Sequence, residues 1–148
     1  MSETLSIGAI PHRPPFLFVD EIIELAEDRI VTTKLADASL DFFRGHYPHF
    51  PVMPGVLVCE CCLQAGALLI AHRLGEYDTS KGVPVVTRIQ DARFRRMVRP
   101  GDLLRVEVRL DDALDGAFHM SGRATVNGQR CTDVKFACML AREALERP

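Results

Sequence analysis

The stretch at residues 54–75, PGVLVCECCLQAGALLIAHRLG, decides the fold of this chain. A proline opens it, its interior is rich in Leu, Ala, Cys and Gln, and Gly75 stands where a C-terminal stop is expected. The stretch therefore predicts a helix over residues 56–74. Between Val56 and Ala71 its only charged residue is Glu60. A helix that is apolar on nearly every face is buried, so other segments must cover it.

Those covering segments have the pattern of β-strands, which are rich in β-branched residues or alternate between apolar and polar side chains. Five such segments are present, at residues 29–35, 84–89, 103–110, 118–126 and 129–140. The last two flank Asn127-Gly128, a dipeptide that favours a type I′ hairpin, so they should pair antiparallel. We therefore predict an α+β fold in which an antiparallel sheet wraps around one long buried helix.

Length and composition limit the class of protein. The chain has 148 residues, 47% of them hydrophobic and 26% charged, which fits one globular domain over residues 1–148. Its net charge of −2 provides no general basic field for nucleic acid. We find no secretory signal, and the apolar run at residues 56–71 is too short for a membrane span. The five cysteines, odd in number, indicate reduced thiols in a cytoplasmic protein. From the charge and the short apolar run we expect no nucleic acid and no membrane as partner.

Glu60 stands out because a carboxylate inside an apolar helix is costly unless it is paired or protonated. Gln64 follows four residues later and shares its helix face. A carboxyl group in such a place suits a general acid at neutral pH. The alternative is a structural network in which Gln64 or a backbone donor satisfies a buried Glu60.

His46 lies in a loop rich in Gly, Pro and aromatic residues, DFFRGHYPHFP at residues 41–51. Imidazole is the natural general base near neutral pH, and Gly45 before it allows an unusual backbone angle. The alternative is a loop histidine bonded to a nearby carbonyl. We expect His12, beside its prolines, to be structural and His49 to be exposed.

The start of the helix is a third candidate. The first helical turn leaves backbone N–H groups unpaired and carries a partial positive charge. Gly55 has no side chain to block approach, so a carbonyl oxygen that gains negative charge could be stabilised there. The alternative is a helix end satisfied by water.

The cysteines do not suggest a metal site. Cys59, Cys61 and Cys62 have C-x-C-C spacing on a helix, unlike the paired C-x₂-C pattern of zinc sites, and they point in different directions. We expect core packing even though His46 is another possible ligand. The arginines at residues 93–96 (RFRR) are locally basic and could steer an acidic partner.

Several of these segments together resemble the (3R)-hydroxyacyl-acyl carrier protein dehydratase family. The resemblance is carried by FFRGHYP (42–48), PVMPGVL (51–57), Glu60 with QAG (64–66), PHR (11–13) and ARFRR (92–96). It runs over about residues 10–142, and the spacing from His46 to Glu60 agrees with the family's catalytic pair. The chain departs from the family at His49-Phe50, at Cys61-Cys62 and at Glu21.

The resemblance implies a hotdog fold and an obligate homodimer, which in this family often assembles into a trimer of dimers. It also implies His46 as the base and Glu60 as the acid, with Gly55, Val56 and Gln64 binding the substrate. That substrate is attached to the phosphopantetheine arm of acyl carrier protein. This partner is acidic and would dock on Arg93, Arg95 and Arg96. No metal and no free cofactor is implied.

The implied activity is dehydration of (3R)-hydroxyacyl thioesters to trans-2-enoyl thioesters in fatty acid or related lipid biosynthesis. Two alternatives stay open at this point. One is an acyl thioesterase on the same fold, in which Glu60 activates water or attacks. The other is a non-catalytic subunit that binds acyl carrier. We also predict a site shared across the dimer, with His46 from one protomer and Glu60 from the other, because the helix is too apolar for one thin sheet to cover.

Overall fold

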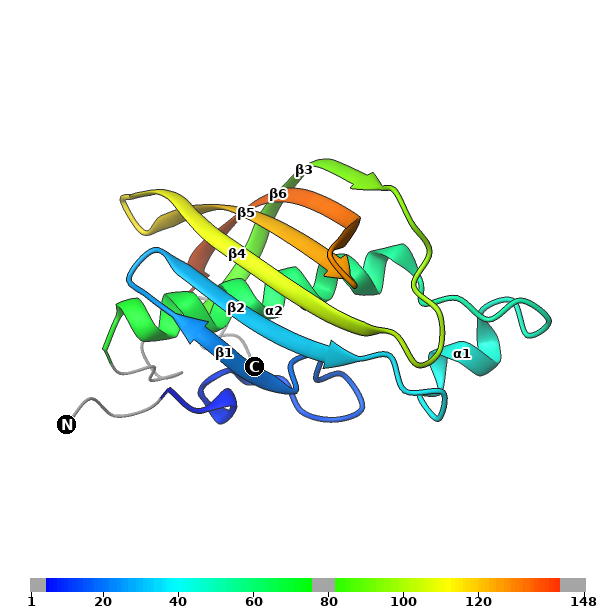
Figure 1. Ribbon diagram of the computed structural model, residues 1–148. Helices are drawn as coiled ribbons and strands as arrows, with labels where there is room; N and C mark the ends of the chain where they lie inside the picture. The colour runs from blue at the N-terminus through cyan, green and yellow to red at the C-terminus, as the bar shows by residue number, and fades with distance from the viewer. Residues whose placement is uncertain (1–4, 76–81, 142–148) are drawn as a thin grey trace.

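The computed structural model describes residues 5–75 and 82–141 (Figure 1). A short 3-10 helix, η1 (Ile7–Ala9), precedes two helices and six strands. The helices are α1 (Phe42–Gly45) and α2 (Gly55–Arg73). The strands are β1 (Glu21–Leu25), β2 (Arg29–Leu35), β3 (Val83–Phe94), β4 (Leu103–Leu114), β5 (Ala117–Val126) and β6 (Gln129–Ala141).

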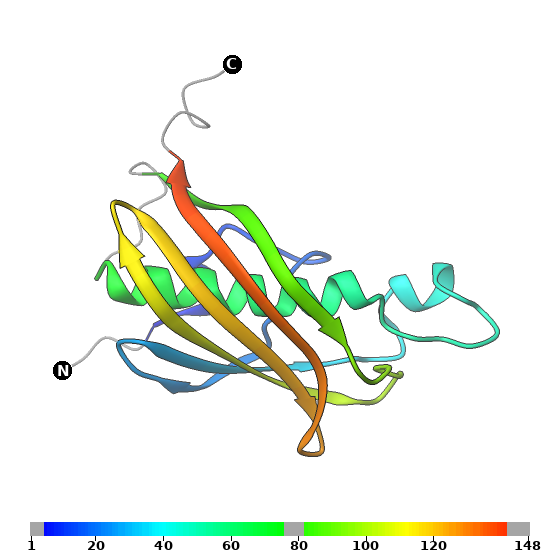
Figure 2. The same ribbon diagram turned by 90° about the horizontal axis from the view of Figure 1, so that it is seen from above.

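The six strands form one antiparallel sheet in the order β1-β2-β4-β5-β6-β3, and β1 and β3 are therefore its edges. The sheet curves over α2, which crosses under the strands from β2 to β3 (Figures 1 and 2). This arrangement confirms the predicted α+β hotdog architecture.

Helix α2 lies very close to the sheet because glycine occupies a contact position on each side. A Cβ atom on Gly122 of β5 would lie 2.8 Å from the Cβ atom of Cys62. A Cβ atom on Gly66 of α2 would lie 2.8 Å from the ring of Phe136 on β6. The helix is long and apolar enough to cross a membrane, but most of it is buried inside the protein. Its apolar character is thus explained by its place in the core of one chain, so the expectation that one sheet could not cover the helix was wrong.

The predicted helix agrees with α2 to within one residue at each end, and Gly75 follows it in the left-handed conformation, with a φ of +80°. All five predicted strands are present, and β3 and β4 extend beyond their predicted ends to Phe94 and Leu114. Asn127 and Gly128 both have positive φ, as a type I′ turn requires. The prediction missed β1 and α1, the second of which lies in the segment interpreted as loop.

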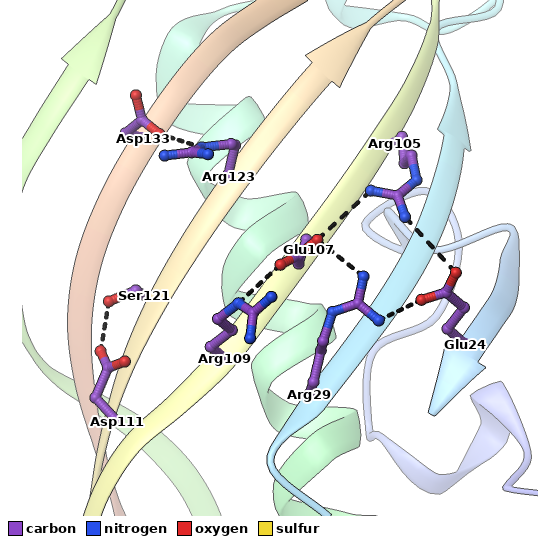
Figure 3. Close-up of polar contacts among 9 residues, drawn as sticks. All are labelled: Glu24, Arg29, Arg105, Glu107, Arg109, Asp111, Ser121, Arg123 and Asp133. Atoms are coloured by element: carbon purple, nitrogen blue, oxygen red, sulfur yellow. Dashed lines mark hydrogen bonds and ion pairs between the residues drawn. The ribbon is translucent and has the colours of Figure 1, made fainter. Parts of the chain in front are cut away.

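The outer face of the sheet, away from α2, is covered by ion pairs (Figure 3). Glu107 on β4 forms ion pairs with Arg29, Arg105 and Arg109. The hydrogen bond from Arg29 is the largest of the effects that hold the pKa of Glu107 below its usual value. This polar face explains why 105, 107 and 109 alternate with the buried apolar residues of the same strand.

Candidate active site

A cavity of about 1100 Å³ opens where α2 begins and β3 ends. Five of the residues singled out from the sequence line it: His46, Gly55, Val56, Arg95 and Arg96. Its apolar wall includes Met53, Val58, Phe94, Met97 and Val98. The fold thus brings the loop histidine, the helix start and two arginines to one space.

His46 is held by its backbone neighbours in one tautomer. Its Nδ1 atom lies 2.8 Å from the carbonyl oxygen of Val52. A carbonyl oxygen only accepts, so Nδ1 carries the proton and donates it there. The Nε2 atom of the neutral ring then keeps its lone pair and is able to act as a base. This carbonyl bond was the alternative to a catalytic role, but the structure makes the two compatible.

The loop around His46 reaches this geometry differently from the prediction. Gly45 would allow an unusual backbone angle, but it ends α1 and has no positive φ. Tyr47 instead adopts the left-handed conformation, with a φ of +53°, and its ring lies 4.4 Å from that of His46 between centroids. The turn falls one residue after His46 because α1 carries the helical backbone through Gly45. His49 is exposed, as predicted.

The start of α2 offers free donors. Pro54 caps the helix without a side-chain hydrogen bond, and its carbonyl oxygen accepts from the amides of Leu57 and Val58. Within residues 5–75 and 82–141, the amides of Gly55 and Val56 have no acceptor. The Phe94 ring covers Gly55 so closely that a Cβ atom there would lie 2.7 Å from it. Only glycine therefore fits at the first position of this helix without moving the ring.

Glu60 lies one turn further along α2, outside the set of residues that lines the cavity. Its Oε1 atom accepts a hydrogen bond of 3.1 Å from the Nε2 atom of Gln64. Gln64 is fully buried and also bonds the segment before β1, donating to the Phe16 carbonyl at 3.0 Å and accepting from the Phe18 amide at 2.7 Å. The contacts of Gln64 thus hold Glu60 and the segment before β1, and the substrate-binding role of Gln64 stays a prediction.

His46 and Glu60 are not brought together within one chain. No hydrogen bond or ion pair joins them among the described residues, and only His46 lines the cavity. The predicted roles of both residues stay predictions at this point.

Comparison with known proteins decides the family. The FabA-like domain model matches residues 10–135. The chain belongs to the FabA-like domain family. It is 38% identical over 139 residues to the 3-hydroxyacyl-acyl-carrier-protein dehydratase FabZ of Solibacter usitatus, covering 94% of this chain and 85% of the relative. It is 41% identical over 133 residues to the FabZ of Anaeromyxobacter dehalogenans, covering 89% and 85%.

Solved structures agree with the fold of this FabA-like chain. The dehydratase heterocomplex ApeI:P of Xenorhabdus doucetiae matches with a TM-score of 0.80 at 13% identity, covering 96% of this chain and 95% of that one. A hypothetical thioesterase of Streptococcus pneumoniae with coenzyme A matches with a TM-score of 0.65 at 14% identity, covering 82% and 84%. At these identities the likeness shows the fold alone and favours neither reaction.

One contact of Glu60 was not predicted. The Nε2 atom of His12 lies 3.6 Å from Glu60 Oε1, and the structural role expected for His12 stays a prediction. The two residues are far apart in the sequence, so no local pattern links them. The one available signal was the presence of His12 in the PHR motif of the resemblance.

The five cysteines of this FabA-like domain are all buried and reduced. Burial raises the pKa of Cys61 to about 12 and that of Cys138 to about 11. Such thiols are poor nucleophiles and poor metal ligands, because both functions need the thiolate. Among the residues that the structure describes, no group of three His, Cys, Asp or Glu side chains could hold a metal ion.

Two residues of the arginine run, Arg95 and Arg96, line the cavity, whereas Arg93 does not. Arg93, Arg95 and Arg96 are all exposed. Arg95 forms an ion pair of 2.8 Å with Asp133, and Arg96 and Arg99 line the cavity. A charged partner that docks on these arginines would therefore stand beside the entrance to the His46 site.

Proposed function

We propose that this protein is a hydro-lyase, a 3-hydroxyacyl-acyl carrier protein dehydratase of fatty acid biosynthesis. It converts (3R)-hydroxyacyl thioesters on acyl carrier protein into trans-2-enoyl thioesters and water. Support comes from the names of its FabZ relatives, which align over most of both chains. The single observation that carries the mechanism is His46, with its Nε2 lone pair free beside an uncapped helix start.

The reaction needs three groups, and this chain offers one residue or more for each. His46 Nε2 removes the proton from the carbon next to the thioester carbonyl. The negative charge that develops on the carbonyl oxygen is stabilised by the amides of Gly55 and Val56 at the positive end of the helix. Glu60 donates its proton to the departing hydroxyl group, so water leaves and a double bond forms. Afterwards the proton on His46 is returned to Glu60, which restores both groups.

The two catalytic groups come from different protomers of a homodimer in this proposal. Strand β3 supports it, because β3 is a twelve-residue edge strand and is exposed along almost all of its length. A long exposed edge with apolar side chains is a site for pairing with another chain. Val85, Val86 and Ile89 are its exposed apolar residues, together with Phe94 at the cavity. Further assembly into a trimer of dimers remains part of the proposal.

The carrier is proposed to dock on Arg93, Arg95 and Arg96. The position of Arg95 and Arg96 in the cavity lining supports this, since an acidic carrier bound there would direct its arm toward His46. The reduced cysteines support a cytoplasmic location. Charge reversal at Arg95 and Arg96 should raise KM for carrier-bound substrate far more than KM for a small thioester mimic. Equal effects on both substrates would contradict docking at these residues.

The function is tested by turnover of 3-hydroxyacyl thioesters of graded length. Formation of a conjugated enoyl thioester is followed by absorbance, and release of free thiol is followed in parallel. Dehydration predicts the first signal without the second, whereas thiol release would favour the thioesterase alternative. Tight carrier binding without either signal would favour the non-catalytic alternative. His46→Ala and Glu60→Gln should each abolish most turnover while the protein stays folded and dimeric.

The shared site is tested by mixing the two inactive variants. His46→Ala and Glu60→Gln protomers are unfolded together and refolded, and exchange is confirmed by mass spectrometry of tagged chains. Random pairing makes half of the dimers mixed, and each mixed dimer has one intact site if the site is shared. About a quarter of wild-type activity should then return. With confirmed exchange, activity no higher than that of the single variants would refute the shared site.

A further inference from the structure

His12 is the only imidazole among the described residues that contacts Glu60. Its Nε2 atom lies 3.6 Å from Glu60 Oε1. Its Nδ1 atom is buried and has no hydrogen-bond partner within the described part of the chain. The side chains of His12 and Glu60 are 27% and 17% exposed, so the contact is largely shielded from solvent.

The segment that carries His12 is fixed on both sides of the histidine. Arg13 donates to the carbonyl oxygens of Ile10 and His12, each at 2.6 Å. Four to six residues later, Gln64 bonds the backbone of Phe16 and Phe18. The same glutamine donates to Glu60, so one side chain of α2 connects the carboxylate to the segment beside it.

The position of Glu60 favours one tautomer of His12. A neutral imidazole carries one N–H, and among the described residues the one acceptor recorded near the ring is Glu60, on the Nε2 side. The 3.6 Å separation is longer than a formed hydrogen bond and within ion-pair distance. Catalytic contacts of this kind commonly shorten when the substrate binds.

We propose that His12 is a positioning residue for Glu60, an inference that rests on the proposed acid role of Glu60. His12 Nε2–H and Gln64 Nε2–H both point at Oε1. Two donors on Oε1 leave that oxygen as an acceptor only, so the acidic proton of Glu60 is held on Oε2. The proton transferred to the leaving hydroxyl therefore comes from one defined oxygen.

The proposal is tested with two amides that differ in reach. The Gln side chain places its –NH₂ near the position of Nε2, whereas Asn places its –NH₂ near Nδ1, away from Glu60. His12→Asn should lower kcat by about tenfold to a hundredfold, less than the 10²–10⁴-fold that a general acid contributes. KM should stay within about twofold, because the segment still binds Gln64. His12→Gln should restore kcat to within about threefold of wild type.

His119→Asn on the exposed part of β5 is the matched control, and we expect it to leave kcat unchanged. Wild-type kcat in His12→Asn would overturn the inference, as would equal losses in the Asn and Gln variants. Glu60→Gln is measured alongside. If Glu60→Gln keeps its activity, the proposed acid role itself fails. If Glu60→Gln is inactive and His12→Asn is not, only the positioning role fails.

A second measurement determines the tautomers in the unmodified protein, and a variant serves only to assign the resonances of His12. Two-bond ¹H–¹⁵N correlation spectra of ¹⁵N-histidine-labelled protein distinguish the two neutral tautomers of each imidazole. The His12 resonances are assigned as those missing from His12→Gln. The proposal expects the Nε2–H tautomer for His12 and the Nδ1–H tautomer for His46. A predominant Nδ1–H tautomer of His12 would overturn it.

Discussion

Replacing Gln64 by methionine should reveal how much its buried amide contributes. Methionine has nearly the same volume, so the change removes hydrogen bonds without opening a cavity. The lost bonds are those to the Phe18 amide, the Phe16 carbonyl and Glu60 Oε1. Their loss therefore isolates the polar contribution of one fully buried side chain.

The size of the effect follows from the exposure of each partner. The Phe18 amide belongs to a residue that is only 3% exposed, so without Gln64 it keeps a desolvated and unpaired N–H, which costs about 1–3 kcal/mol. The Phe16 carbonyl belongs to a residue that is 48% exposed, so water compensates much of its loss. Glu60 loses one of its two contacts on Oε1. We expect a total loss of roughly 2–4 kcal/mol in the free energy of unfolding.

Urea and thermal unfolding measure this loss. For a domain of this size the transition temperature should fall by roughly 5–15 °C. Gln64→Glu is the isosteric control: its second oxygen faces the Phe16 carbonyl and the carboxylate of Glu60, so acceptors meet acceptors. This variant should be at least as destabilised as Gln64→Met. A Gln64→Met protein within about 0.5 kcal/mol of wild type would refute the role assigned to these hydrogen bonds.

Three further predictions concern packing, ionisation and assembly. Gly122→Ala should destabilise the fold by about 1–3 kcal/mol in urea unfolding, because its new Cβ atom would lie 2.8 Å from that of Cys62; no loss would contradict this close approach. Burial raises the pKa of Cys138 to about 11, so between about pH 9 and 11 the thiol ionises only in the unfolded chain. In this pH range the free energy of unfolding should therefore fall by about 1.4 kcal/mol per pH unit on account of Cys138. Cys138→Ala should show a correspondingly shallower pH slope, and an unchanged slope would contradict the shift. Ile89→Lys on the β3 edge should give monomers by size-exclusion chromatography and lose turnover, whereas Leu114→Lys, exposed at the end of β4, should do neither. A dimeric and active Ile89→Lys variant would argue against pairing through β3.

The sequence predicted well those elements whose pattern of apolar and polar side chains follows their burial. Helix α2 is apolar all round because the sheet covers it, and β4 alternates because one face packs on α2 and the other carries ion pairs. Strand β1 was missed because its edge position leaves its burial irregular, and a register shift between Ile22 and Glu24 breaks the alternation. The C-terminal part of β3 was missed because its polar side chains show no strand pattern. Backbone pairing with β6, interrupted at Gln90–Arg93, holds this part as a strand.

The candidate site likewise has features that the sequence displays and features that only the folded chain creates. His46 and Glu60 could be singled out from the sequence because each is an ionisable group among apolar, aromatic or Gly/Pro neighbours, and their roles stay predictions. The tautomer of His46 was not predictable, because it depends on the Val52 carbonyl lying 2.8 Å away in the folded loop. The contact between His12 and Glu60 was equally hidden, since it exists only after the N-terminal segment packs along α2.

Strand β3 connects the separate parts of the proposed mechanism. Its free edge is the surface on which a second copy would pair, and its last residue, Phe94, covers the helix start at Gly55. The arginines proposed to receive the carrier lie on this same end of β3 and directly after it. In one chain His46 lines the cavity and Glu60 does not. In the proposed dimer, pairing along β3 supplies the missing acid from the second copy. Changes at the β3 edge should therefore alter turnover and assembly together, whereas changes at Gln64 or His12 should alter turnover without dissociating the dimer.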